Sequence, residues 1–345
     1  MTNNYSSRIT IDEIAKKSGV SKTTVSRVIN NKPDVHPETR TKINAIIAEN
    51  NFHPNLFAKG KTAQKINHIG LIVPQNVRQL FYNQFYLDVL QGILDTTEKR
   101  NYYLLFCYVN KTNYVEMFEQ KRVEGFILLS PAALDQSIIR ELKSANIPLV
   151  STAKVLDDPE IPFVDIDNYQ GAVAAVKYLI SLGHSKIAFF GKPGLTSNYE
   201  RMQGYKNTLE ESNISVNADY IQTVDTTSIE SGKEIMKIFL DMDDPPTAVF
   251  TACDIMAFGA IKAIQEAGLR VPEDISVIGF DDISLSRNMD PPLTTIMQPA
   301  FEKGELATEM LIDSLSSLKD AEAKILNAEL VVRRSTCRVG NKQYA

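Results

Sequence analysis

From His68 onward, short apolar runs alternate with segments of helical periodicity. Apolar runs without regular polar alternation are typical of strands in parallel sheets that helices cover on both faces. Two sets of such runs follow one another, which predicts two doubly wound α/β subdomains with a cleft between them. The expected strands are residues 69–73, 103–108, 125–129 and 149–151 in the first set, and 186–190, 220–223, 248–251 and 276–280 in the second.

The composition excludes several classes of protein. The 345 residues allow two or three domains, and 43% hydrophobic with 23% charged residues excludes disordered and fibrous chains. Three scattered cysteines, Cys107, Cys253 and Cys337, do not form a disulfide framework, and the four histidines lack the spacing of zinc ligands. No run approaches the roughly eighteen apolar residues of a membrane span, and residues 1–7 lack the apolar core of a signal peptide. We expect a cytoplasmic protein without a metal or cofactor.

The net charge of −5 averages two oppositely charged parts. Residues 1–66 contain eleven of the 37 Lys and Arg residues and five of the 42 Asp and Glu residues. The remaining 279 residues contain 26 Lys and Arg and 37 Asp and Glu. The formal net charge is therefore +6 for residues 1–66 and −11 for the rest of the chain. Such asymmetry indicates a head that binds a polyanion, attached to an acidic body. A charged face that is merely solvated is the alternative.

The head of the chain has the pattern of a helix-turn-helix unit. Thr10 and Glu13 are spaced as a capping box at the start of a first helix. Gly19 suits a tight turn, and Ser21 is expected to cap a second helix from residue 22 to about residue 30. Pro37 is a favourable first residue for a third helix. Three short helices with a glycine turn between the first two predict this unit, although a generic three-helix bundle fits the same spacing.

The second predicted helix carries side chains suited to DNA on the face opposite its apolar residues. Lys22 and Arg27 can donate to guanine acceptors or to phosphates. Thr23 can form a hydrogen bond or contact a thymine methyl group. Since a helix that enters the major groove presents such groups near its N-terminus, this helix is the candidate recognition helix.

Several stretches of the head resemble the LacI/GalR family of bacterial transcriptional regulators. They are residues 10–15 (Thr-Ile-Asp-Glu-Ile-Ala), 15–21 (Ala-Lys-Lys-Ser-Gly-Val-Ser), 24–30 (Thr-Val-Ser-Arg-Val-Ile-Asn), 39–40 and 52–55. The resemblance implies that Lys22 and Thr23 choose the operator sequence and that Ser26 and Arg27 contact the DNA backbone and bases. The expected DNA-binding residues are Thr10, Ser21, Lys22, Thr23, Ser26, Arg27, Asn30, Asn55, Ala58, Lys59 and Lys61.

The linker that follows departs from the family pattern. In the family this stretch forms a short hinge helix on DNA, and a leucine from each subunit is wedged into the minor groove. The usual Ala-Arg-Ser-Leu is Ala-Lys-Gly-Lys at residues 58–61, so that Lys61 takes the leucine position. The glycine before it weakens a helix by about 1 kcal/mol relative to alanine. Either Leu56 or Phe57 supplies the wedge, or the protein bends its operator less and relies on contacts between lysines and phosphates.

The body is similar to the effector domain of the same family, which itself resembles periplasmic sugar-binding proteins. The stretches that carry this resemblance are residues 182–188, 274–282 and 292–296, and the whole resemblance spans about residues 8–338. It implies a headpiece at 1–53, a hinge at 54–66 and an effector-binding and dimerisation body at 67–340. The first subdomain is expected at about 67–165 and 296–325, and the second at about 166–295 and 326–340.

Ligands of parallel sheets bind at the carboxyl ends of the strands, where several polar residues of this sequence lie. The resemblance implies that Arg201 and Asp281 clamp vicinal hydroxyls, because each can make two parallel hydrogen bonds. Phe81 and Tyr82 occupy the place of family aromatics that stack on the ligand, and core packing is the alternative role. The expected effector-binding residues are Phe81, Tyr82, Ser130, Arg201, Cys253, Asp254 and Asp281.

One of these positions departs from the family pattern. Many sugar-binding members carry Asn-Asp where this chain has Cys253 and Asp254. Cysteine is a weak donor and acceptor, so one strong contact with a sugar is missing. Asp254 has an alternative role as the cap of the next helix.

The resemblance implies a homodimeric repressor of a pseudo-palindromic operator DNA, controlled by a small effector such as a mono- or oligosaccharide. Alternatives are a regulator controlled mainly by a phosphocarrier protein and a sugar-binding module that does not bind DNA. An enzyme is not expected, because the sequence has neither a P-loop nor a nucleophile elbow and the pair at 281–282 lacks a third metal ligand. Phe85, Val89 and Ile93 lie in line on an expected helix and are candidates for the dimer surface or for core packing.

Overall fold

The structure, a computed structural model, describes residues 10–29, 32–50, 67–74, 83–108, 113–131, 134–155, 158, 160–316 and 322–340. The chain divides into two separately packed units, Met1–Lys65 and Ile66–Ala345, here termed the headpiece and the body. Within the described ranges, every helix is too short or too polar to cross a membrane. The asparagine at position 30 and the expected hinge residues Asn55, Ala58, Lys59 and Lys61 lie outside these ranges, as do Phe81 and Tyr82.

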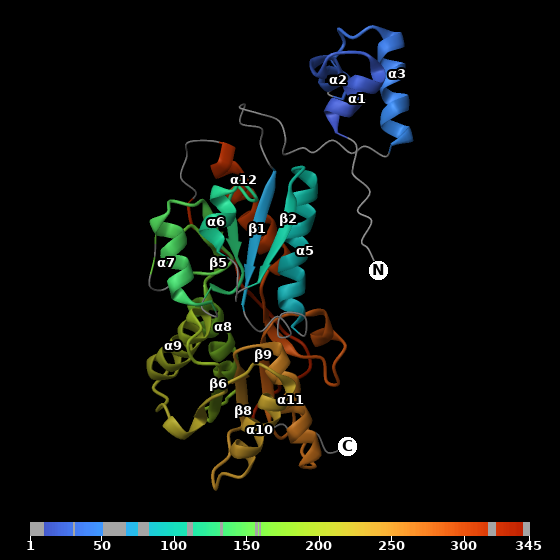
Figure 1. The fold of residues 1–345 in the computed structure, drawn as a ribbon. Coiled ribbons are helices and arrows are strands. Elements are labelled where there is room, and N and C mark those ends of the chain that lie inside the picture. Colours follow the sequence, from blue (N-terminus) through green and yellow to red (C-terminus); the bar gives the residue numbers. More distant parts are fainter. Residues whose placement is uncertain are drawn as a thin grey trace, which may run out of the picture. The chain divides into compact units, whose positions relative to one another are not determined.

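The headpiece consists of three short helices (Figure 1). They are α1 (Ile11–Ser18), α2 (Lys22–Ile29) and α3 (Pro37–Glu49). Their shared core is small and apolar, with Ile14, Val25, Val28 and Ile43 buried at its centre. Because the second helix buries only one face in this core, its polar face is left for other contacts.

The start and end of α1 follow the local sequence. Thr10 Oγ1 accepts a hydrogen bond from the Glu13 backbone N–H at 3.3 Å, and the Glu13 carboxylate accepts one from the Thr10 N–H at 2.7 Å. Gly19 ends the helix at a φ of 72°, in the left-handed region that glycine tolerates best. Ser21 Oγ accepts from the Thr24 N–H at 3.1 Å and so caps α2. The predicted capping box, turn and cap are confirmed.

The first lobe of the body is a four-stranded parallel sheet with the order β2-β1-β3-β4. Its strands are β1 (His68–Val73), β2 (Tyr103–Tyr108), β3 (Phe126–Leu128) and β4 (Leu149–Ser151). Its helices are α5 (Gln84–Lys99), α6 (Tyr114–Glu119), α7 (Gln136–Ser144) and α12 (Ala300–Ser316). Two separate apolar clusters line the two faces, one beneath α5 and α12 and the other beneath α6 and α7.

Helices α5 and α12 approach each other closely because glycines face each other at their contact. A Cβ on Gly92 would lie 2.0 Å from the Phe301 carbonyl oxygen, and one on Gly304 would lie 2.0 Å from the Val89 carbonyl oxygen. Val89 and Ile93 are buried in this contact. These two residues therefore pack in the core, and the hypothesis that they form the dimer surface is wrong.

The second lobe is a six-stranded sheet with the order β12-β10-β9-β8-β6-β7, in which only β12 is antiparallel. Its strands are β6 (Ile187–Gly191), β7 (Ile221–Thr223), β8 (Ala248–Thr251), β9 (Ser276–Asp281), β10 (Thr294–Met297) and β12 (Glu329–Val331). Helices α8 (Asn168–Ser181) and α9 (Thr196–Glu211) cover one face, and α10 (Ile229–Leu240) and α11 (Asp254–Glu266) cover the other (Figure 1). Two 3₁₀ helices, η3 (Ala218–Tyr220) and η4 (Ser284–Arg287), lie in the connections.

The lobes are assembled from separate stretches of sequence. The chain crosses from the first lobe to the second through β5 (Val164–Ile166), and it crosses again through β11 (Lys324–Leu326), which pairs with β5 in parallel. Between these crossings, it leaves β10 in the second lobe to form α12 in the first. The predicted pair of doubly wound α/β subdomains is confirmed, with strand ends that differ by one residue at most. Strands β5, β10, β11 and β12 were not expected.

The segment that follows β12 is attached to the second sheet by a buried histidine. His184 contacts Thr247 Oγ1 at 2.9 Å through Nδ1, and through Nε2 it contacts Ser276 Oγ at 3.1 Å and the Cys337 carbonyl oxygen at 3.0 Å. Burial lowers the pKa of His184 below 6.5, which favours the neutral ring. This histidine is therefore a structural residue.

Candidate functional site

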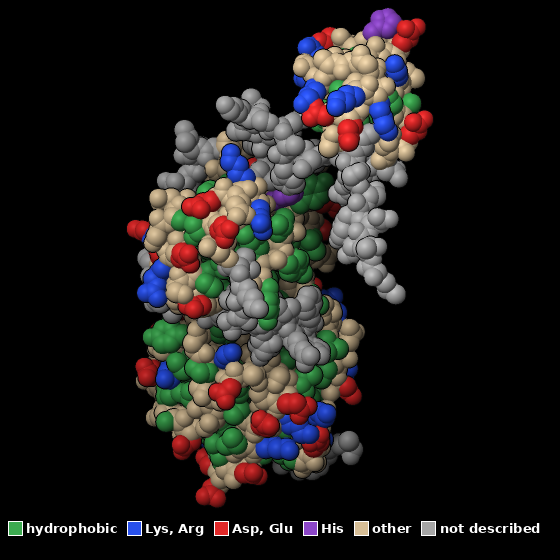
Figure 2. Space-filling view, viewed as in Figure 1, with side chains coloured by type: hydrophobic (Ala, Val, Ile, Leu, Met, Phe, Trp, Pro, Cys, Tyr) green, Lys and Arg blue, Asp and Glu red, His purple; other side chains and the backbone are tan. Residues whose placement is uncertain are grey.

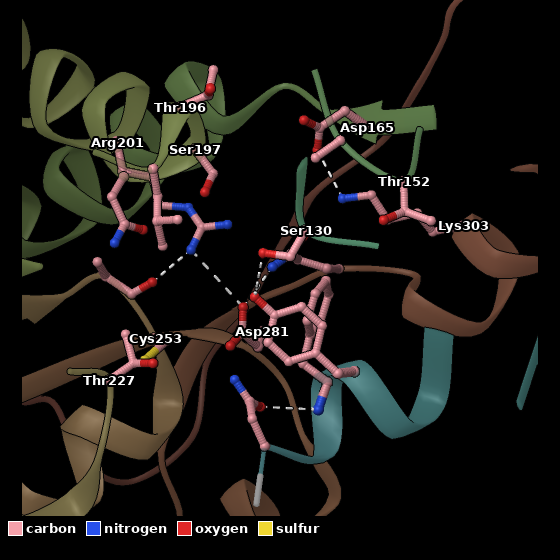
Figure 3. Close-up of a pocket in the computed structure, with 18 of the residues that line it drawn as sticks. Ser130, Thr152, Asp165, Thr196, Ser197, Arg201, Thr227, Cys253, Asp281 and Lys303 are labelled. Carbon is pink, nitrogen blue, oxygen red and sulfur yellow. Dashed lines mark hydrogen bonds and ion pairs between the residues drawn. The ribbon is translucent and has the colours of Figure 1, made fainter. Parts of the chain in front are cut away.

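A cavity lies between the two lobes of the body and opens to solvent (Figure 3). Side chains from the first lobe line one side, among them Ser130 and Thr152, and side chains from the second lobe line the other, among them Ser197 and Cys253. Hydroxyl and charged groups dominate the labelled side chains in Figure 3. The cavity is thus suited to a small polar molecule that contacts both lobes.

Arg201 extends from α9 into this cavity and is held rigidly. Its side chain is 5% exposed, and its Nε and Nη2 donate to Asn168 Oδ1 at 3.0 and 2.8 Å. Nη1 donates to the Ala252 carbonyl oxygen, and the guanidinium carbon lies 3.5 Å from the centre of the Phe280 ring. A guanidinium has five N–H donors, so the donors that these bonds leave over are available to a ligand.

Asp281 faces Arg201 across the cavity, and Arg201 Nη1 lies 3.9 Å from Asp281 Oδ1 (Figure 3). Asp281 is the last residue of β9 and has a φ of 122°, a backbone conformation that is unfavourable for residues other than glycine. Its carboxylate accepts a hydrogen bond from Gln298 Nε2. Burial raises the pKa of this carboxyl from 3.8 to about 6, while Arg201 opposes the rise. At neutral pH the cavity therefore presents an ionised acceptor beside a cationic donor.

A second buried ion pair lines the cavity on the side of the first lobe. Lys303 of α12 and Asp165 of β5 are 4% and 3% exposed, and Nζ lies 2.8 Å from Oδ1. The carboxylate also accepts from the backbone N–H groups of Lys154 and Ile166 at 3.0 and 2.8 Å. Burial raises the pKa of Asp165, but Lys303 and these N–H groups outweigh burial and hold it below 3.8. The Asp165 carboxylate is thus ionised, and each of its oxygens accepts at least one hydrogen bond.

Among the residues that the structure describes, two polar side-chain contacts join the lobes directly. Lys154 follows β4 in the first lobe, and its Nζ lies 3.0 Å from Glu200 Oε1 on α9 in the second. Ser284 Oγ of η4 donates to Gln84 Oε1 of α5 at 2.8 Å. Any change in the angle between the lobes must alter or break these contacts.

The structure brings four of the seven expected effector residues to this cavity, namely Ser130, Arg201, Cys253 and Asp281. Ser130 Oγ lies 3.2 Å from the Tyr86 hydroxyl, and burial raises the pKa of the Cys253 thiol. Phe81 and Tyr82 lie outside the described ranges.

Asp254 is a correction to the expected site. Its fully buried carboxylate accepts hydrogen bonds from the Ile283 N–H at 3.0 Å and from the Ser286 and Thr295 hydroxyls at 2.6 Å each. These partners leave it with no access to the cavity, and Cys253, not Asp254, occupies the cap position of α11. Asp254 is therefore an internal residue of the second lobe, neither a ligand contact nor a cap.

Sequence reasoning missed several residues of the cavity. Lys303, Asp165 and Lys154 supply charge, and Phe85 and Tyr86 supply aromatic rings. These two rings lie in the first turn of α5, four residues after the expected pair Phe81 and Tyr82, which lies outside the described residues. No local signal marks Lys303, because it lies in a helix between an exposed glutamate, Glu302, and a glycine, where a lysine looks like an ordinary surface residue. Among the side chains that the structure describes, no cluster of three or more potential metal ligands occurs.

The headpiece presents its predicted recognition helix with the expected polar face. Thr23 is exposed and Ser26 half-buried on α2. The Lys22 ammonium pairs with Asp12 of α1, and Arg27 pairs with Asp34 of the turn before α3. Thr10 and Ser21 serve as helix caps.

Comparisons with known proteins match both units. Residues 10–55 match the family described as bacterial regulatory proteins of the lacI family, and residues 176–336 match the periplasmic binding protein-like domain. The chain is 35% identical to the probable HTH-type transcriptional repressor ExuR of Bacillus subtilis (strain 168), over 96% of this chain and 99% of that protein. It is 35% identical to the catabolite control protein A of Priestia megaterium, over 88% and 91%.

Solved structures are similar over nearly the whole chain. The lac repressor dimer bound to operator and the anti-inducer ONPF matches with a TM-score of 0.80 and 29% identity, over 95% of this chain and 99% of that chain. The complex of the transcriptional regulator CelR with cellobiose matches with a TM-score of 0.72 and 29% identity, over 95% and 100%. A helix-turn-helix headpiece and a two-lobed body with a polar cavity define a DNA-binding transcriptional regulator. The chain belongs to the lacI family of bacterial regulatory proteins.

Proposed function

We propose that this protein is a homodimeric repressor of a pseudo-palindromic operator, and that a mono- or oligosaccharide bound in the body cavity controls its affinity for DNA. The observation that carries the proposal is the pair Arg201 and Asp281, which face each other in a cavity shared by both lobes. The relatives named above are regulators, and one similar structure holds cellobiose.

The chemistry of the cavity supports a ligand with vicinal hydroxyls. A hydroxyl can donate to the Asp281 carboxylate while its neighbour accepts from Arg201. Ser130 and Thr152 add hydroxyls on the opposite side. The rings of Phe85 and Tyr86 offer apolar surface to the carbon face of a sugar.

The proposed mechanism is a population shift between open and closed arrangements of the lobes. The effector favours closure because it makes contacts to both lobes at once, and closure changes the spacing of the two headpieces in the dimer. Equal affinity for both arrangements would shift nothing, so the difference in affinity is the regulatory signal. We propose that a sugar induces release from DNA.

We propose that the dimer forms through the first lobe. β2 is an edge strand of its sheet, and Tyr103, Phe106 and Tyr108 on it are 69%, 53% and 48% exposed. Leu87 and Leu94 of α5 are also exposed. Large apolar side chains gathered on an exposed edge strand and an adjoining helix are typical of a protein interface. Two subunits double the base contacts that one recognition helix makes.

Control by a phosphocarrier protein, which the resemblance to the family's catabolite-control members implies, is the second candidate. A catabolite control protein A, that of Priestia megaterium, is among the relatives. The polar cavity with its facing Arg201 and Asp281 favours a small effector instead. A thermal-shift screen of mono- and oligosaccharides against the purified full chain, followed by operator-release assays, tests the effector. Binding of phosphocarrier protein with no response to any sugar would favour the second candidate.

Replacing Arg27 by alanine is expected to weaken operator binding by at least about tenfold. A bidentate contact between arginine and guanine contributes about 1–3 kcal/mol per base pair read, and the dimer contains two such residues. Fluorescence anisotropy with a labelled operator fragment at fixed salt measures the change. Lys42→Ala removes the same charge from an exposed position on α3 and serves as the control. Equal effects of the two variants would mean that Arg27 does not read the DNA.

Effector affinity is expected to fall as the pH drops through about 6. Burial raises the pKa of Asp281 to about 6, and the protonated carboxyl loses acceptor capacity for ligand hydroxyls. The groups around it are Arg201, Gln298, Lys303 and the buried Asp254. Below that pH the affinity should fall by up to about tenfold per pH unit. Calorimetric titrations between pH 5 and 8 check this, and Asp281→Asn should remove the dependence. A flat profile for the unmodified protein would refute the role of Asp281 as an acceptor.

A further inference from the structure

Both cationic side chains of the recognition helix are paired with acidic residues of neighbouring elements. Lys22 Nζ contacts a carboxylate oxygen of Asp12, and Arg27 Nη2 contacts one of Asp34. The Lys22 and Asp12 side chains are 68% and 52% exposed, and those of Arg27 and Asp34 are 51% and 47% exposed. Figure 2 shows Lys and Arg side chains interspersed with Asp and Glu on the visible face of the headpiece. Lys22 and Arg27 are here termed the reading cations. Carboxylates beside them are unexpected on a DNA-binding surface, because phosphates repel carboxylates.

The contact between Arg27 and Asp34 is bidentate. Arg27 Nε donates to Asp34 Oδ1 at 3.3 Å, while Nη2 contacts Oδ2. The hydrogen bond from Arg27 lowers the pKa of Asp34, so the carboxylate stays ionised. Two of the five guanidinium N–H donors are occupied, which leaves the Nη1 donors and one Nη2 donor free of Asp34.

This geometry affects phosphates and bases differently. A guanidinium can present its remaining donors to the O6 and N7 acceptors of guanine with the carboxylate still in place. A phosphate contact instead places a second anion beside Asp34, or requires that the carboxylate be displaced. Since binding to arbitrary DNA rests almost entirely on cation–phosphate contacts, the carboxylate penalises non-specific binding more than operator binding.

We propose that Asp34, with Asp12 in the same role beside Lys22, is a specificity-determining residue that reserves the reading cations for base edges and keeps them from the phosphates of arbitrary DNA. The proposal rests on the DNA-binding function of the headpiece. It adds that sequence discrimination resides partly in acidic residues that touch neither bases nor phosphates. It also explains why a headpiece with an excess of positive charge keeps carboxylates next to its reading helix.

The test is Asp34→Asn in the full-length protein. Two labelled duplexes of equal length are needed, one enriched by the unmodified protein from a random library and the other a scrambled version of it. We expect affinity for the scrambled duplex to rise about threefold to tenfold, in the range of an exposed ion pair counted in both subunits. Affinity for the enriched duplex should change less than twofold. For the scrambled duplex, the slope of log affinity against log salt concentration should become steeper by about 2, because the substitution frees one cation in each subunit to contact a phosphate.

Two further variants separate the proposal from simpler explanations. Glu49→Gln removes the same charge from an exposed position on α3 and should raise neither affinity appreciably. Asp34→Glu keeps the charge and should keep the low affinity for scrambled DNA. If Asp34→Asn and Glu49→Gln raise both affinities alike, general charge explains the effect and the proposal is overturned. The proposal would also be overturned if Asp34→Asn lost affinity for the enriched duplex and not for the scrambled one, because Asp34 would then help Arg27 to bind the operator. Failure of the unmodified protein to enrich any sequence would instead refute the proposed function.

Discussion

Arg201→Ala should leave operator binding intact and abolish its release by effector. The guanidinium provides donors that no other described side chain of the cavity can replace in the same geometry, since it is fixed by Asn168, Ala252 and the Phe280 ring. Truncation of a buried, hydrogen-bonded charge that binds a ligand typically costs about 2–5 kcal/mol, or about 30-fold to several thousand-fold in affinity. Calorimetry with the effector from the sugar screen, together with operator-release titrations, measures the loss.

Two controls make this result interpretable. Arg270→Ala removes an exposed arginine that pairs with Asp274 four residues along, and it should leave the effector response unchanged. Arg201→Lys keeps the charge without the planar fork, so it should recover only a small part of the affinity. Release of DNA by Arg201→Ala at an unchanged effector concentration would place the effector site elsewhere.

Lys303→Met is expected to destabilise the body by about 3–5 kcal/mol, because it leaves the Asp165 carboxylate buried without a counter-charge. Without Lys303, burial is the largest influence on Asp165 and only the N–H groups of Lys154 and Ile166 oppose it, so the pKa of Asp165 should rise above that of the unfolded chain. The folded variant would bind the extra proton, so its stability should rise as the pH falls toward 3.8. Urea unfolding followed by circular dichroism at several pH values measures both effects.

A double variant tests the cause of this loss. In Lys303→Met/Asp165→Asn the buried charge is gone. The N–H groups of Lys154 and Ile166 donate to different oxygens of the Asp165 carboxylate, so the amide oxygen keeps only one of these hydrogen bonds, while the larger penalty of the unpaired charge is removed. Most of the lost stability should therefore return. Lys186→Met breaks the exposed pair with Asp244 and should cost at most about 1 kcal/mol. A cost for Lys303→Met no greater than that of Lys186→Met would contradict the account.

Local signals made most elements of the fold predictable. The capping box at Thr10 and the apolar runs of the buried strands carry their information within a few residues. The strands that were missed lack such a signal. β5 and β11 are three residues long and exist as strands because they pair with each other across 158 or more positions of sequence. β12 is a short antiparallel edge strand with exposed and half-buried residues.

The same distinction explains the site. Asp281 was found because it lies in a stretch that resembles the family, and Arg201 because it matches the family's ligand clamp. The structure places both in the cavity. Lys303 was not found, because its importance depends on Asp165, which lies 138 residues away. Asp254 was misassigned for the converse reason. Its position shortly after a strand is typical of a ligand-binding residue, but its carboxylate accepts hydrogen bonds from the hydroxyls of Ser286 and Thr295, which lie 32 and 41 residues further along the chain.

The interleaving of the two lobes affects how this protein forms during synthesis. The headpiece has its own core and is complete once about residue 49 has left the ribosome. The first lobe has to wait for α12, and the second has to wait for β12 at Glu329–Val331. For most of its translation, a nascent chain thus contains a folded headpiece without a complete effector-binding body. A messenger truncated between residue 49 and β12 would yield fragments that contain the helix-turn-helix unit but lack a complete second lobe, and therefore lack the effector cavity.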